Sequence, residues 1–328
     1  MNTLTQCHEA SVPPPVPAMP AAPPLPYHRL NRMQPRSSRW WRPVAAILVS
    51  VGLYGVLAVA FAMSLAISRE VGGATLASPN ADDPTNPFDW LVGLGMIALM
   101  IPAVILGMRW GGGARGTIHS VRGRIRWGLL LRGAVIALPL YALILGGAWL
   151  IGPPEDVTWP TPGWSLVAVF VLIVVLAPLQ SAGEEYLFRG LPMQALGTWL
   201  RSPLWGILLP VPLFVLGHGY NWVGSIAVAV GAICCGALTW KSGGLELAIV
   251  LHVANNLVLM LLAPFSPSSL QQGEVPVEVL PFDVILTVGT TALLWWWASR
   301  RHGVAAWEAV TTASRVRGGA VRSAATSG

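Results

Sequence analysis

The order of apolar and polar positions along the chain predicts a series of long helices. Apolar runs recur through most of the sequence and are separated by short polar segments. A helix needs about 20 apolar residues to cross a bilayer. On that basis the runs predict eight membrane-spanning segments, at residues 44–68, 90–108, 128–151, 164–183, 204–218, 223–240, 244–263 and 283–298. The fifth contains Pro210 and Pro212, which interrupt helices, and the sixth is short, so we expect the segment "GHGYNWVG", residues 217–224, to dip back into the protein.

The composition supports the same class of protein. Hydrophobic residues make up 54% of the chain and charged residues 10%, and the mean hydropathy is +0.61. These values exclude an ordinary soluble domain with a charged surface. We therefore predict an all-α fold, a polytopic membrane helical bundle of about eight transmembrane helices.

The distribution of charge predicts how the chain is oriented. With the amino terminus inside, every Lys and Arg except Arg69 falls on the cytoplasmic side, where basic residues concentrate in membrane proteins. The opposite loops carry acids, namely Glu70, Asp82, Asp83, Glu155, Asp156, Glu274 and Glu278. We expect a multi-pass protein of the plasma membrane with both termini cytoplasmic. Topology then explains the net charge of +6 without a nucleic-acid partner.

Three regions follow from these patterns. Residues 1–42 are rich in proline and are expected to form a disordered cytoplasmic tail, residues 43–299 the polytopic membrane domain, and residues 300–328 a basic cytoplasmic tail. Four histidines lie outside the apolar runs and are expected to be solvated: His8, His28, His119 and His302.

The segment "SAGEEYLFRG", residues 181–190, places charged residues beside an apolar run. Ionisable groups inside a membrane are costly and usually functional. Glu185 and Arg189 are four residues apart with the acid first, which favours an ion pair on a helix. Glu184 is then left without a local cation, which makes it the candidate general base.

Two further pairs of polar or aromatic residues have helical spacing. His252 and Asn256 share one helix face, as do Phe214 and His218. Asn255 is turned about 100° from Asn256 and is the weaker candidate. Because isolated polar groups in lipid need partners, we expect these groups to converge on one wet cavity.

The chemistry available to such a cavity is amide hydrolysis. Glu184, assisted by His218, would activate water, while His252 and Asn256 would stabilise the oxyanion. A catalytic zinc ion held by Glu184, His218 and His252 is the competing interpretation. The favoured mechanism requires no cofactor, and the HExxH zinc signature is absent from the sequence.

Three motifs resemble one known family. "EEYLFRG" is similar to its EExxxR motif, "FVLGH" to FxxxH and "HVANN" to HxxxN, in the family order and within about residues 164–263. The family is the CAAX protease and bacteriocin-processing (CPBP, Abi) family of intramembrane glutamate proteases, whose members are often described as metalloproteases.

The resemblance implies a membrane endopeptidase whose site opens toward the cytoplasmic half of the bilayer. It makes Glu184 the base, with Glu185 and Arg189 as structural support. His218 becomes the second water-activating group, and His252 with Asn256 stabilises the oxyanion. We expect His218 to reach the middle of the membrane near Glu184.

Two other functions remain open at this point. A non-proteolytic membrane scaffold, or a bacteriocin self-immunity protein, would keep the same fold without the reaction. A transporter would need polar residues in both halves of the chain, whereas they cluster in one half here. The expected partners are the lipid bilayer and a peptide or membrane-protein substrate.

Overall fold

The protein is helical throughout the part of the chain that the structure describes. The computed structural model describes residues 23–72, 77–78, 82–267 and 273–314. In chain order the helical elements are η1 (Tyr27–Met33), α1 (Arg42–Gly72), α2 (Pro87–Ala98), α3 (Met100–Trp110), α4 (Trp127–Ile151), α5 (Trp164–Glu185), η2 (Tyr186–Gly190), α6 (Leu191–Trp199), α7 (Leu204–Leu208), α8 (Val211–Leu216), α9 (Trp222–Ser242), α10 (Glu246–Leu262), η3 (Ala263–Phe265) and α11 (Val279–His302).

Seven helical stretches are long and apolar enough to cross a membrane. They are Arg42–Ile67, Pro87–Trp110, Trp127–Ile151, Trp164–Trp199, Trp222–Ser242, Glu246–Phe265 and Val279–His302, among the described residues. Each coincides with one of the predicted apolar runs. The predicted fold class, an all-α polytopic membrane bundle, is therefore confirmed.

The fifth predicted span differs from the other seven. Its apolar stretch, Leu204–Leu216, is divided between α7 and α8. At 1.5 Å per residue it reaches about 20 Å, short of the roughly 30 Å hydrocarbon layer. Pro210 is the N-cap of α8, directly before the helix begins at Val211, and a proline has no backbone N–H to continue the preceding helix. Among the described residues, the prediction of about eight transmembrane helices is corrected to seven long helical stretches and one short helix pair, and the interruption lies at the prolines as expected.

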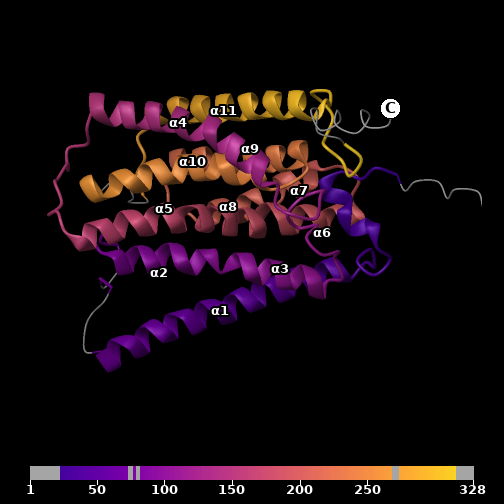
Figure 1. Ribbon diagram of the computed structural model, residues 1–328, viewed down its shortest axis with the longest axis horizontal. Coiled ribbons are helices and arrows are strands. Elements are labelled where there is room, and N and C mark those ends of the chain that lie inside the picture. Colours follow the sequence, from indigo (N-terminus) through magenta and orange to yellow (C-terminus); the bar gives the residue numbers. More distant parts are fainter. Residues whose placement is uncertain (1–22, 73–76, 79–81, 268–272, 315–328) are drawn as a thin grey trace, which may run out of the picture.

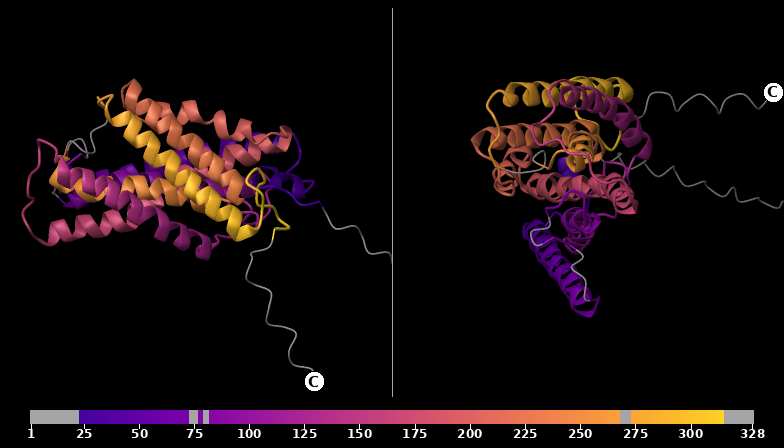
Figure 2. Two further views of the ribbon diagram at one scale, coloured as in Figure 1. Left: turned by 90° about the horizontal axis from the view of Figure 1, so that it is seen from above. Right: turned by 90° about the vertical axis from the view of Figure 1, so that its left-hand side faces the viewer.

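Helix α10 lies at the centre of the bundle. It packs against α4, α5, α9 and α11, and Figure 1 shows it between these neighbours. Helix α1 lies at the edge, where α3 is its main partner; the right-hand view of Figure 2 shows it leaning away from the other helices. The arrangement buries most of α10 and the end of α5 that carries Gln180 to Glu185, and it leaves most of α1 open to lipid.

The two ends of the described chain meet at one end of the bundle. Pro26 and Thr311 form an isolated antiparallel bridge, so the first and last described segments lie on the same side. Lys241 fixes the second of them, because its buried Nζ donates to the carbonyls of Ala305, Ala306 and Glu308 at 2.6, 3.1 and 2.6 Å. Ends on the same side require an even number of passes along the bundle, so the short α7–α8 pair counts as a pass beside the seven long helical stretches.

Part of the predicted amino-terminal tail is ordered. Within residues 1–42, the stretch Tyr27–Met33 forms η1 and packs on α6. Tyr27 is fully buried and donates its hydroxyl hydrogen to the carbonyl of Ile118 at 2.5 Å. The expectation of disorder is thus corrected for this stretch, because its aromatic side chain finds a buried partner. Residues 1–22 and 315–328 lie outside the described residues.

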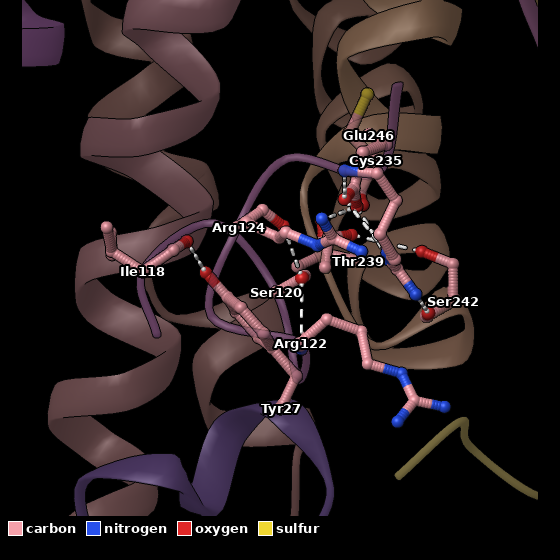
Figure 3. A network of polar contacts seen from close by, with 11 residues as sticks. Tyr27, Ile118, Ser120, Arg122, Arg124, Cys235, Thr239, Ser242 and Glu246 are labelled. Atoms are coloured by element: carbon pink, nitrogen blue, oxygen red, sulfur yellow. Dashed lines mark hydrogen bonds and ion pairs between the residues drawn. The ribbon is translucent and has the colours of Figure 1, made fainter. Parts of the chain in front are cut away.

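Loop 111–126 closes the same end of the bundle. It docks on the α9–α10 turn through a bridge between Ser120 and Gly244 and a hydrogen bond from Val121 N to Gly243 O at 2.8 Å. Figure 3 shows Ser120 joined to the backbone of Arg124 and Arg122, with Tyr27 reaching Ile118 beside them. We call this loop, the α9–α10 turn and segment 303–314 together the loop end.

A buried ion pair joins the loop end to the central helix. Arg126 donates to Glu246 at the start of α10 through its backbone N, Nε and Nη2, at 2.8, 2.9 and 2.6 Å. Its Nη1 also donates to Ser242 O at 2.7 Å. Buried ion pairs offset their desolvation only when hydrogen bonds satisfy both partners, as these four bonds do here.

Three histidines expected to be solvated are at least partly buried. His28 is buried and makes a hydrogen bond between Nε2 and Arg201 O at 3.0 Å. His302 is buried at the end of α11, and His119 is half-buried with Nδ1 on the hydroxyl of Tyr186. The expectation fails because segments that look like tails or loops pack back onto the bundle. His8 lies outside the described residues.

Candidate active site

The charged motif lies where the regular helix is interrupted. Helix α5 ends at Glu185, the next five residues form a single π-helical turn, η2, and α6 then continues in the same direction. Such π-turns occur often at functional sites. Glu184 falls near the middle of the continuous stretch Trp164–Trp199, so its carboxylate lies well inside the apolar bundle.

Glu185 contacts two basic side chains, those of Arg189 and His252. It is fully buried, and its Oε1 lies 3.1 Å from Arg189 Nη1 and 2.8 Å from His252 Nδ1. The predicted Glu185–Arg189 ion pair therefore forms. Arg189 also places its guanidinium 4.0 Å from the ring centre of Phe214, which gives the cation a second stabilising contact.

His252 lies between the two neighbouring carboxylates. Its Nε2 is 3.3 Å from Glu184 Oε2, while Nδ1 faces Glu185. Because a carboxylate only accepts, Nδ1 carries a hydrogen. The expectation that Glu184 has no local partner is thus corrected: α10, far away in the sequence, supplies an imidazole.

Glu184 Oε2 and His252 Nε2 face each other inside the bundle. Glu185, the neighbouring acid, is balanced by Arg189. The 3.3 Å approach is an ion-pair distance, but buried Oε2 of Glu184 has no hydrogen-bond partner among the described residues.

A second pair of polar side chains lies one turn along the same two helices. Asn256 Nδ2 donates to Gln180 Oε1 at 3.1 Å. Gln180 precedes Glu184 by four residues on α5, and Asn256 follows His252 by four on α10. Because residues four apart share a helix face, the antiparallel helices meet through two side-chain pairs. One pair is ionisable, Glu184 with His252, and the other is a pair of amides, Gln180 with Asn256.

Sequence reasoning missed Gln180 and undervalued Asn255. Asn255 Nδ2 donates to Asn256 Oδ1 at 3.2 Å, and Ser181 Oγ donates to Gln180 Oε1 at 3.2 Å. Asn256 therefore accepts at Oδ1 from Asn255 and donates from Nδ2 to Gln180. The i, i+4 spacing of Gln180 and Glu184 is the signal that would have found Gln180.

His218 reaches the edge of this group through Phe214. The Phe214 ring lies 4.7 Å from the ring of His218 and 6.2 Å from that of His252, centre to centre. His218 Nδ1 donates to Phe214 O at 2.8 Å, which leaves Nε2 as the acceptor in the neutral ring. In the described structure His218 does not approach either carboxylate to ion-pair distance. Glu184 and His252 meet directly, and His218 stands one aromatic ring away.

The geometry of the site does not match a metal centre. In the described part of the chain, no three His, Cys, Asp or Glu side chains gather as metal ligands would. Glu184, His218 and His252 as placed therefore do not fit a three-ligand zinc site.

Close helix contact fixes the position of the carboxylates. A Cβ on Gly183 would meet the carbonyl oxygen of Ile97 at 2.6 Å, too close for any side chain. Glycine at this position lets α5 touch the end of α2 directly before Glu184. The backbone that carries the candidate base is therefore held by a neighbouring helix.

The fold and site define a multi-pass helical membrane protein with a buried carboxylate–imidazole centre. Residues 163–258 match the family model described as type II CAAX prenyl endopeptidase Rce1-like. This segment contains all the site residues named above, and it confirms the resemblance seen in the three motifs. The match supports a CAAX-type intramembrane protease function in general.

One curated relative extends the similarity beyond that segment. The chain is 25% identical to a Bacillus subtilis (strain 168) protein described as uncharacterized protein YyaK, over 235 residues. The alignment covers 67% of this chain and 76% of the relative. No solved structure matches the chain.

Proposed function

We propose that the protein is an intramembrane endopeptidase that hydrolyses a peptide bond with water activated by Glu184. The observation that carries the proposal is the buried chain of contacts from Glu184 through His252 and Glu185 to Arg189. A carboxylate beside an imidazole is a usual device for proton transfer. The unsatisfied Oε2 of Glu184 offers an acceptor for the attacking water.

The reaction divides among the chain's own groups. Glu184 removes a proton from water as the oxygen attacks the scissile carbonyl. The second Nδ2 hydrogen of Asn256 stabilises the oxyanion, and Glu184 passes the proton taken from water by way of His252 to the leaving amine as the C–N bond breaks. Both ring nitrogens of His252 face carboxylates, so proton transfer suits it better than the oxyanion role expected from the motif.

The remaining residues have supporting roles. Glu185 orients His252, Arg189 balances Glu185, and Phe214 packs against Arg189 and both imidazoles. His218 assists the water through its free Nε2. The substrate is a peptide or membrane protein reaching the site within the plasma membrane, and both termini of the enzyme face the cytoplasm. No cofactor is required.

The test compares cells that carry wild type, Glu184→Gln or Glu278→Gln. Glu278 is an exposed acid at the start of α11, so its replacement is the matched control for loss of one carboxylate. We expect uncleaved substrate to accumulate in Glu184→Gln alone, as seen in peptide termini from membrane fractions.

Three results would change the assignment. Identical termini in all three strains would reject proteolysis, and retention of the cellular phenotype in Glu184→Gln would favour the scaffold or immunity function. Inhibition of purified wild type by a chelator, with recovery on adding zinc, would reject the metal-free mechanism.

A further inference from the structure

The corner where the chain enters α1 carries a concentrated positive charge. Arg36, Arg39 and Arg42, together with Pro35, line a hollow of about 410 Å³. None of these arginines pairs with a carboxylate in the described part of the chain. None of the contacts within the candidate active site involves these arginines, so that site does not explain the charge.

Local contacts hold the arginines in place. Arg42 Nη1 donates to Trp110 O at 3.0 Å, and its guanidinium lies 4.1 Å from the ring centre of Trp41. Its Nε is buried without a hydrogen-bond partner among the described residues. The stem of Arg36 packs on Gly112, whose φ of +84° suits glycine. Neighbouring residues therefore hold Arg36 and Arg42 in position, and one buried donor of Arg42 has no partner among the described residues.

Exposed tryptophans place this corner at the membrane surface. Trp40 and Trp110 are 74% and 71% exposed, and Trp41 is also exposed. Tryptophan is enriched at the level of the lipid headgroups. Directly along α1 from the hollow, Val44, Leu48 and Val51 are exposed on one helix face. Positive charge beside an apolar stripe matches a molecule with an anionic head and hydrocarbon chains.

We propose that this hollow binds the phosphate headgroup of an anionic phospholipid, whose acyl chains run along the Val44–Leu48–Val51 face of α1. Guanidinium groups present paired N–H donors that match phosphate oxygens. Basic residues beside a transmembrane helix attract anionic lipids in the same way. Because α1 has few helix neighbours, a bound lipid would also cover its open side.

The experiment titrates the purified full-length protein in detergent with phosphatidylglycerol or phosphatidylcholine and counts bound lipids by native mass spectrometry. The test variant is Arg36→Gln with Arg39→Gln, both exposed. The control is Arg115→Gln with Arg124→Gln, which removes two exposed charges from loop 111–126. We expect the test variant to bind the first phosphatidylglycerol about tenfold more weakly, and the control to match wild type.

Competition with inorganic phosphate separates a lipid site from a free-anion site. We expect phosphate not to displace phosphatidylglycerol, because it lacks the chains that contact α1. Displacement by phosphate would overturn the lipid assignment, as would equal binding of phosphatidylcholine. Equal affinity of the test and control variants for phosphatidylglycerol would overturn the site itself.

Discussion

At the scale of single residues, hydrogen bonds and ion pairs hold the side chains of the site in position. His252 uses both ring nitrogens on carboxylates, and Asn256 uses its oxygen and one amide hydrogen on Asn255 and Gln180. Each group therefore has little orientational freedom left. The motif residues were predicted from the sequence, but Gln180 was not, because its partner is on another helix.

Replacing Gln180 by leucine is expected to lower kcat about tenfold with little change in KM, because Asn256 loses the acceptor that aims its amide at the oxyanion. Asn256→Ala, which removes the donor itself, should cost about a hundredfold. The measurement is steady-state kinetics on the substrate found in the Glu184→Gln comparison. Gln194→Leu is the matched control, since Gln194 is buried and donates to Thr117 O outside the site. A wild-type kcat in Gln180→Leu would contradict this role.

At the scale of elements, the site depends on how closely α5 approaches its neighbours. Gly183 touches the backbone of α2, and the π-turn η2 lets the helix continue toward α6 while Arg189 still reaches Glu185. The sequence predicted α5 from its apolar run. It did not predict the contact at Gly183, because that contact involves a residue more than 80 positions earlier in the chain.

Gly183→Ala is expected to destabilise the fold by about 1–3 kcal/mol, because the new methyl group meets a backbone carbonyl that has no rotamer to change. Thermal unfolding in detergent provides the measurement. Gly93→Ala in α2 is the control, since nothing lies within 4 Å of a Cβ there, and alanine favours a helix over glycine. An unchanged unfolding temperature in Gly183→Ala would show that α2 and α5 are farther apart than described.

At the scale of the whole molecule, the loop end is connected to the candidate site. His119 in loop 111–126 contacts the hydroxyl of Tyr186, the first residue of η2 and the neighbour of Glu185. Burial lowers the pKa of His119 from its ordinary value of 6.5, and the negative charge of Glu246 acts in the opposite direction. The folded protein therefore favours the neutral imidazole, which its docked position requires.

The stability from docking His119 is expected to be present above about pH 6.5 and to be lost as the pH falls, because the unfolded chain takes up the proton more readily. The stability difference between wild type and His119→Asn should therefore shrink between about pH 8 and pH 5. Thermal unfolding of both proteins across this range is the measurement. Burial also lowers the pKa of His28, but His28 is present in both proteins, so its titration cancels in the difference. A constant difference would contradict the assignment.

The sequence alone determined the apolar helices, the class of membrane protein and the motif residues, because these depend on local length, composition and i, i+4 spacing. Tertiary structure decided the rest. It paired α5 with α10 so that His252 falls between Glu184 and Glu185, divided the fifth apolar run at Pro210, and packed Tyr27, His28 and His119 into the loop end. These features depend on contacts between distant parts of the chain, and a local sequence pattern does not show which distant segments will pack together.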